Sequence, residues 1–274
     1  MIDIQSQRDT RDVPLQKVGI KGLEYPVRVL DKANKTQGTS GVVDLFVNLP
    51  QHFKGTHMSR FIEIFHKYHT DLSMKQFLSL LQEIREKLEA ERAFGTISFP
   101  FFMEKKAPVS GQPGMMAYRC TYEGTVSAQG EHHFLVSVEV PVTTLCPCSK
   151  AISQYGAHNQ RGKVVVKLES KGFFWIEDVI AVVEEAASSG LYSVLKRADE
   201  KFVTERAYEN PRFVEDVVRE VYLGLQNFSG GDGALEEDTG VQDGECCFRW
   251  FSVEAENFES IHNHNAYAYA EFQG

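Results

Sequence analysis

The chain of 274 residues is 42% hydrophobic and 11% aromatic, which is enough apolar material for one large domain or two smaller ones. Its formal net charge of −9 argues against a general nucleic-acid binder. No apolar run approaches the roughly 18 residues of a membrane span, and the polar N-terminus lacks the pattern of a secretion signal. We therefore expect a cytoplasmic protein that binds neither nucleic acid nor membrane.

Hydrophobic periodicity predicts the same order of elements twice along the chain. The first half is predicted to contain strands over 16–30 and 41–49, helices over 57–68 and 73–91, and strands over 94–103 and 116–127. The second half is predicted to contain strands over 133–142 and 163–170, helices over 175–188 and 198–226, and strands over 247–257 and 265–272. Pro211 should interrupt the last helix, because the residue before a proline is biased away from helical geometry.

This repeated order suggests two modules, 1–128 and 129–274, although no sequence repeat accompanies it. Residues 229–245 are rich in glycine, aspartate and glutamate, and this composition predicts an exposed, solvated insertion between a helix and a strand.

The stretch 141–168 carries the most unusual pattern, because Cys146 and Cys148 are separated only by Pro147 and are followed by His158. The chain has five cysteines, an odd number, and a reducing cytosol disfavours disulfides. The spacing does not match the paired ligands of a closed structural zinc site. If the segment is extended, both thiols face one side, and one can bind a metal while the other acts as an acid, base or nucleophile. Buried structural cysteines are the competing interpretation.

Four other polar residues are candidates for the same chemistry. Glu200 and Glu215 lie in predicted helices, where an isolated carboxylate is usually a solvated surface group. His262 and His264 are two residues apart just before a predicted strand, an arrangement that suits proton transfer or metal binding but also fits exposed loop histidines.

Several long stretches closely resemble the prokaryotic type IB GTP cyclohydrolase I family. The stretches are QRDTRDVPLQKVGIKGLEYPV (7–27), GTHMSRF (55–61), PVTTLCPCSKAISQYGAHNQRG (141–162), LKRADEKFVTERAYENPRFVEDVVREV (195–221) and ENFESIHNHNAYA (256–268). The resemblance runs nearly end to end with the motifs in the family's order, and the acidic segment 229–245 is its main departure.

The resemblance implies an α+β tunnelling fold with two ββααββ modules in one chain, antiparallel sheets with helices on one face, and assembly into a barrel as a homotetramer. It also implies the family reaction, in which GTP and water give formate and 7,8-dihydroneopterin triphosphate for folate and, in many bacteria, queuosine synthesis. Related alternatives are an archaeal-type enzyme with a cyclic phosphate product, another tunnelling-fold pterin or deazapurine enzyme, and a binding protein without turnover.

The resemblance also implies roles for individual residues. Cys146, His158 and Glu200 match the family's metal-binding positions, and the mixed ligand set suits one divalent ion such as Zn, Mn or Fe(II). Cys148 matches the essential free cysteine. Glu215 matches the glutamate that anchors the guanine edge of the GTP substrate, and His262 and His264 match the histidines of acid–base catalysis. The cations that hold the triphosphate stay unassigned.

Overall fold

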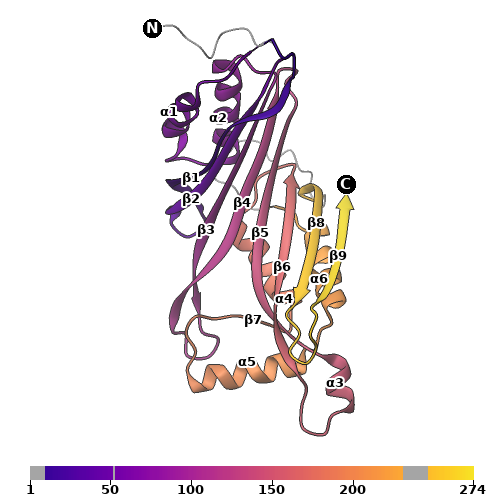
Figure 1. Ribbon diagram of the computed structural model, residues 1–274. Coiled ribbons are helices and arrows are strands. Elements are labelled where there is room, and N and C mark those ends of the chain that lie inside the picture. Colours follow the sequence, from indigo (N-terminus) through magenta and orange to yellow (C-terminus); the bar gives the residue numbers. More distant parts are fainter. Residues whose placement is uncertain (1–9, 52, 231–245) are drawn as a thin grey trace. The chain divides into compact units, whose positions relative to one another are not determined.

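The computed structural model describes residues 10–51, 53–230 and 246–274, and its α+β architecture is built on one antiparallel sheet. Figure 1 shows the ribbon and the element labels. Over the described residues there are nine strands, in the order β1-β2-β3-β4-β5-β6-β8-β9, with the short β7 paired to β5, and six helices. The sheet is not closed, because the described β1 and β9 each have a neighbour on one side only.

The elements of the first half follow the predicted order strand, strand, helix, helix, strand, strand. They are β1 (Leu15–Asp31), β2 (Lys35–Leu49), α1 (Met58–Tyr68), α2 (Met74–Lys87), β3 (Arg92–Lys106) and β4 (Pro113–Ser127).

The second half adds two short elements to the same order. It contains β5 (His132–Leu145), α3 (Pro147–Ile152), β6 (Asn159–Ser170), α4 (Ile176–Ala186), β7 (Ser189–Gly190), α5 (Arg197–Glu209), α6 (Val214–Gln226), β8 (Phe248–Asn257) and β9 (Ala266–Gln273).

The α+β class and the element order are therefore confirmed, and so is the interruption at Pro211, since α5 ends at Glu209 and α6 begins at Val214. The six-residue helix α3 was not predicted. Most of the predicted insertion, 231–245, lies outside the described residues. Among the residues that are described, no helix combines the length and apolar character needed to cross a bilayer.

By internal contacts the chain divides into two compact units. Unit 1 comprises the described residues within 1–100 and 121–136, and unit 2 comprises 101–120 and the described residues within 137–274. The long strands β3, β4 and β5 contribute segments to both units. The units are defined by contacts within the structure, whereas the modules 1–128 and 129–274 are defined by element order and stay a prediction.

The core of unit 1 forms where α1 and α2 pack on the sheet (Figure 1). Strand β2 alternates buried and less buried residues with period two, and α2 buries one stripe that includes Phe77 and Leu81. Gly95 of β3 lies beneath that stripe, where a Cβ would come within 2.7 Å of a Leu81 methyl carbon. The absent side chain at Gly95 thus allows the helix to approach the sheet closely.

The core of unit 2 forms between α4, α6 and the strands β6, β8 and β9. Helix α4 presents buried Val179 and Val183, and α6 presents buried Val217 and Val221, each set at helical spacing. Gly224 permits the helices to touch, because a Cβ there would lie 2.6 Å from Val182 Cγ1.

Candidate active site

The candidate site begins where β5 ends, because Cys146 follows directly and is the N-cap of α3. The Cys146 backbone is extended, and its Sγ accepts a hydrogen bond of 3.4 Å from the Ser149 N–H. Pro147 occupies the first helical position, where its missing N–H and fixed φ suit a helix start. The CPC sequence is thus a strand end followed by a helix start.

This geometry makes the expectation of two thiols on one face of an extended segment wrong. Cys148 already belongs to the first turn of α3, so the alternation that would align it with Cys146 does not apply. Cys146 is half-buried, whereas Cys148 is exposed, and all five cysteines are free thiols. The two neighbouring thiols therefore have different environments, and the interpretation of both as buried structural cysteines is excluded.

His158 lies beside Cys146 because β6 starts next to the end of β5. The Cys146 N–H donates to the His158 carbonyl at 3.1 Å, and the His158 N–H donates to Ser149 Oγ at 3.2 Å. The imidazole Nδ1 lies 3.0 Å from Gln160 Oε1 and 3.3 Å from Ser260 Oγ. These contacts engage one ring nitrogen and leave Nε2 with no partner among the described residues.

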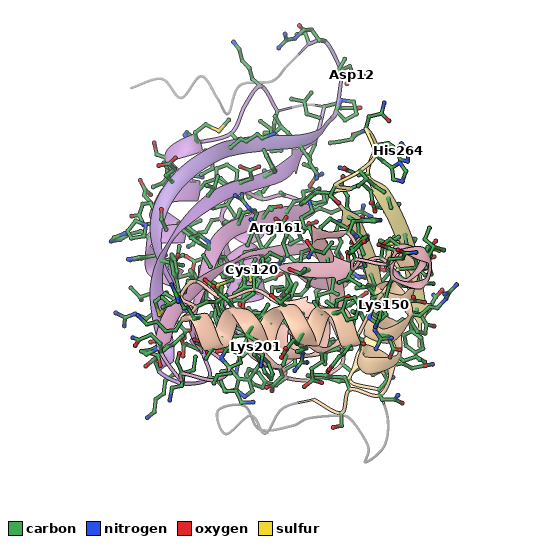
Figure 2. The ribbon with its side chains drawn as sticks, turned by 90° about the horizontal axis from the view of Figure 1, so that it is seen from below. Asp12, Cys120, Lys150, Arg161, Lys201 and His264 are labelled. Atoms are coloured by element: carbon green, nitrogen blue, oxygen red, sulfur yellow. The ribbon has the colours of Figure 1, made fainter. Side chains whose placement is uncertain are left out.

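The turn between β8 and β9 brings the two candidate histidines to the same strand ends. Ser260 of this turn contacts the His158 ring, and the Phe258 N–H donates to the Arg161 carbonyl at 2.9 Å. His262 and His264 are exposed and stack with ring centroids 5.2 Å apart and an interplanar angle of 18°. They are adjacent through this stacking and not through strand alternation, since the turn is not extended; Figure 2 labels His264 on this turn.

Glu200 is an exposed residue near the start of α5, and its neighbour Asp199 fixes that helix start. The buried Asp199 carboxylate accepts four hydrogen bonds of 2.7–2.8 Å, from the Val109, Ser110 and Lys196 N–H groups and the Ser110 hydroxyl. Burial alone would raise the pKa of Asp199, but these hydrogen bonds hold it well below its usual range. The β3–β4 turn therefore anchors the helix that carries Glu200.

Helix α5 meets α3 at the end remote from Glu200. Lys150 of α3 donates from Nζ to the Tyr208 carbonyl, and the same ammonium lies 4.3 Å from the centroid of the Tyr208 ring. Glu200 is eight residues earlier, which corresponds to about 12 Å along a helix axis. Consistent with this placement, no group of three or more His, Cys, Asp or Glu side chains suited to a metal occurs among the described residues. The single chain brings Cys146 and His158 together and leaves Glu200 apart.

Glu215 occupies the second position of α6, where its charge is favourable beside the helix N-terminus. The carboxylate is exposed and has no partner within the described part of the chain, so it is available to a ligand. The start of α6 is held next to the end of β5, because the Arg212 N–H donates to the Leu145 carbonyl at 3.0 Å, one residue before Cys146.

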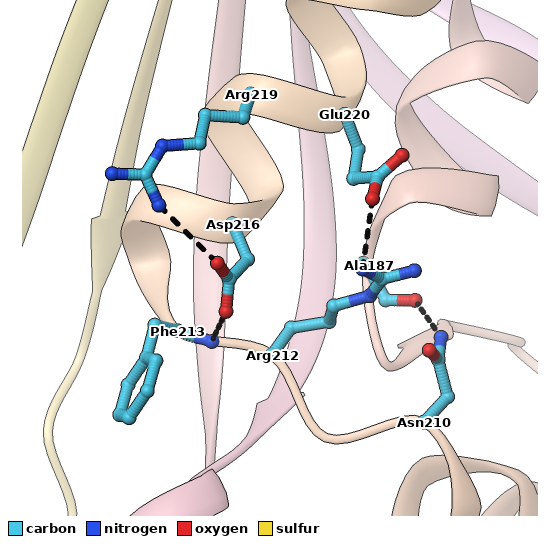
Figure 3. A network of polar contacts seen from close by, with 7 residues as sticks. All are labelled: Ala187, Asn210, Arg212, Phe213, Asp216, Arg219 and Glu220. Carbon is cyan, nitrogen blue, oxygen red and sulfur yellow. Dashed lines mark hydrogen bonds and ion pairs between the residues drawn. The ribbon is translucent and has the colours of Figure 1, made fainter.

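Polar contacts around the α5–α6 connection support this position (Figure 3). Asp216 accepts from the Phe213 N–H at 3.0 Å and caps α6, and the Arg212 guanidinium donates to Glu220 at 3.0 Å. Asn210 donates to the Ala187 carbonyl at 2.9 Å at the end of α4.

Sequence reasoning missed the supporting residues Gln160, Asp199 and Ser260. Asp199 had a local signal, because it is the third residue of α5. An acidic residue at this position often accepts a hydrogen bond from the backbone N–H of the residue that precedes the helix, which is Lys196 here. Gln160 had the period-two spacing from His158 on one strand face. Ser260 had no local signal, because its partner His158 is 102 residues away.

Cys146, His158 and the turn with His262 and His264 lie at the ends of neighbouring strands, and thiol and imidazole groups are the residue types that enzymes use for proton transfer. A family model described as Type I GTP cyclohydrolase folE2 matches residues 1–268. The GTP cyclohydrolase FolE2 of Syntrophus aciditrophicus is 52% identical over 271 residues, covering 99% of each chain, and that of Geobacter sulfurreducens is 52% identical over 268 residues, covering 98% of this chain and 96% of its own. The chain belongs to the type I GTP cyclohydrolase FolE2 family.

Among solved structures, a hyper-thermostable AgUricase mutant aligns with 94% of this chain and 91% of its own, with 8% identity and a TM-score of 0.49.

Proposed function

We propose that this enzyme converts GTP and water to formate and 7,8-dihydroneopterin triphosphate, the first step of folate synthesis, in the cytoplasm. Family membership over nearly the whole chain supports the reaction. The observation that carries the site is the convergence of Cys146, His158 and the His262–His264 turn at the ends of β5, β6 and β8.

Cys146 and His158 fit one divalent ion such as Zn, Mn or Fe(II), because the two residues are neighbours through a backbone hydrogen bond and their side chains combine a soft with a borderline donor. Glu200 is the proposed third ligand, and a set of three protein ligands leaves a position open for substrate. A bound divalent ion would supply Lewis acidity toward the purine and water.

The protein side chains hold and move protons around that centre. Glu215 accepts hydrogen bonds from the guanine N1–H and 2-amino group, a pair of donors that adenine does not offer. The exposed Cys148 thiol acts as a catalytic acid, base or nucleophile at the start of α3, and His262 and His264 transfer protons during the ribose rearrangement and pterin closure.

The test is turnover by the metal-reconstituted enzyme, with formate measured and the pterin product weighed by mass spectrometry. One formate released per GTP consumed, together with a product of the mass of 7,8-dihydroneopterin triphosphate, supports the proposal. A cyclic phosphate product would instead assign the archaeal-type reaction, and GTP binding without formate would identify a binding protein.

Two variants separate the cysteines. Cys148→Ala should keep the metal, because no ligand is lost, and should fail in turnover. Cys146→Ala should lose both metal and turnover. Metal loss or normal turnover in Cys148→Ala would contradict this division of roles.

We also propose a homotetramer in which the strands of several copies assemble into a barrel. Because Glu200 lies apart from Cys146 and His158 in one chain, mixed tetramers show which copy supplies it. If Cys146→Ala and Glu200→Ala subunits restore activity when mixed, different copies contribute the ligands. If the mixture stays inactive while each variant still assembles, one copy contributes all three.

A further inference from the structure

Three side chains form a hydrogen-bonded relay that begins in the buried sheet and ends on the His158 ring. Gln160 Nε2 donates to Thr144 Oγ1 at 2.8 Å, and Gln160 Oε1 lies 3.0 Å from His158 Nδ1. Thr144 is 0% exposed and Gln160 is 7% exposed. All three residues belong to unit 2.

The strand register places this relay. Cys146 and His158 are joined by a backbone hydrogen bond between the antiparallel strands β5 and β6. Thr144 precedes Cys146 by two residues and Gln160 follows His158 by two, so the two side chains are direct cross-strand neighbours on one face.

The relay selects one neutral form of the imidazole. A carboxamide has one donor end and one acceptor end, so the Gln160 amide that donates to Thr144 presents its oxygen to His158 Nδ1. A second oxygen, Ser260 Oγ, lies 3.3 Å from the same nitrogen. An N–H can be shared between two acceptors, whereas the single lone pair of an unprotonated ring nitrogen accepts one strong hydrogen bond. Both contacts therefore favour a proton on Nδ1.

We propose that Gln160, oriented by Thr144, is a positioning residue that holds His158 in the Nδ1–H tautomer and presents the Nε2 lone pair to the metal. The tautomer assignment stands on the geometry alone, and its consequence for the metal rests on the proposed function. A ligand histidine whose second nitrogen donates to a fixed acceptor is both more basic and better oriented, and losing that acceptor typically weakens metal binding about 10–100-fold.

The first measurement is the tautomer in the metal-free protein, read from the ring ¹⁵N shifts of His158. The signal is identified among the nine histidines by its absence in His158→Asn. The wild-type protein should show protonated Nδ1, and Gln160→Met, which keeps the side-chain length but has no acceptor, should lose this preference. A wild-type ring protonated on Nε2 would overturn the assignment.

The second measurement is zinc affinity, titrated against a chromophoric chelator. Gln160→Met should bind zinc about 10–100-fold more weakly. Gln160→Glu should rescue the affinity, because a carboxylate oxygen still accepts from Nδ1 and the Thr144 hydroxyl can donate to the other oxygen.

Thr144, which accepts the hydrogen bond from the Gln160 amide, provides a matched pair of variants. Thr144→Ser keeps the hydroxyl and should retain the wild-type tautomer and zinc affinity. Thr144→Val keeps the shape but releases the amide, and should give mixed tautomers with weaker zinc binding. Ser260→Ala is the control, because it removes only the longer contact and should leave the tautomer unchanged.

The outcomes distinguish this inference from the proposed metal site. If His158→Asn leaves zinc binding unchanged, His158 is not a ligand, and both the metal assignment and the relay's role toward it fail. If His158→Asn abolishes zinc binding while folded Gln160→Met and Thr144→Val keep the wild-type tautomer and affinity, the metal site stands and the relay is wrong.

Discussion

Glu184 on α4 is the centre of a largely buried polar network in unit 2, and replacing it by glutamine tests how that network stabilises the fold. Its carboxylate accepts from Lys105 Nζ at 2.6 Å and from the Tyr118 hydroxyl at 3.0 Å. The Lys105 ammonium also lies 4.1 Å from the centroid of the Tyr192 ring. Burial, followed by the charge and hydrogen bond of Glu184, raises the pKa of Tyr118, so its phenol remains a donor at neutral pH.

The expected loss of stability follows from the two hydrogen-bond donors that contact the Glu184 carboxylate. A glutamine has only one oxygen for them, so its Nε2 would face either the Lys105 ammonium or the Tyr118 hydroxyl, and the lysine charge would have no counter-charge within the network. Removing one partner of a fully buried pair costs about 3–5 kcal/mol. Because the Lys105 and Glu184 side chains are 13% and 14% exposed, water offsets part of this cost. We expect Glu184→Gln to lower the free energy of unfolding by about 2–3 kcal/mol.

The assay is urea unfolding followed by tryptophan fluorescence, which reports on unit 2 because Trp175 and Trp250 both belong to it. The matched variants are Lys105→Met and the double variant Lys105→Met/Glu184→Gln. The double variant removes the unpaired charge, so it should be about 1–2 kcal/mol more stable than the sum of the single effects predicts. A loss below about 0.5 kcal/mol in Glu184→Gln, or strict additivity, would refute the reasoning.

Three further predictions concern other parts of the molecule. Brief iodoacetamide treatment should alkylate the exposed Cys148 well before Cys120, whose pKa is raised by burial; peptide mass spectrometry checks this order, and early labelling of Cys120 would contradict it. Gly95→Ala should cost about 1–3 kcal/mol in urea unfolding, since the new methyl group crowds Leu81, and an unchanged midpoint would show that α2 adjusts freely. Glu215→Gln should weaken transition-state binding by about 1–3 kcal/mol, which lowers kcat/KM for GTP by about 5–150-fold, and an unchanged kcat/KM would remove Glu215 from guanine recognition.

The order of elements could be predicted because its signals are local. Period-two burial in β2 and the apolar stripe of α2 are properties of single segments, and so is the break at Pro211. The helix α3 was not predicted, although Pro147 favours a helix start. This helix has no buried residue and therefore no hydrophobic stripe to detect.

The site could be predicted only as a set of candidate residues, because its geometry depends on contacts between distant segments. Asp199 anchors the start of α5 through Ser110, 89 residues earlier. Ser260 reaches His158 over a separation of 102 residues. No spacing rule encodes such partners, and the environments of Cys146 and Cys148 likewise depended on a helix that periodicity did not reveal.

Strand register explains why Cys146 and His158 are backbone neighbours while Glu200, the third proposed ligand, lies apart from them. Strands β5, β6, β8 and β9 are consecutive neighbours, so the end of β5, the start of β6 and the β8–β9 turn lie at the same end of these strands. A slip of one residue between β5 and β6 would turn Thr144 and Gln160 to opposite faces and break the relay to His158. The register that pairs Cys146 with His158 therefore also sets the proposed tautomer. Glu200 depends instead on the anchoring of α5 by Asp199, so changes in the β3–β4 turn should alter its position while leaving the Cys146–His158 pair intact.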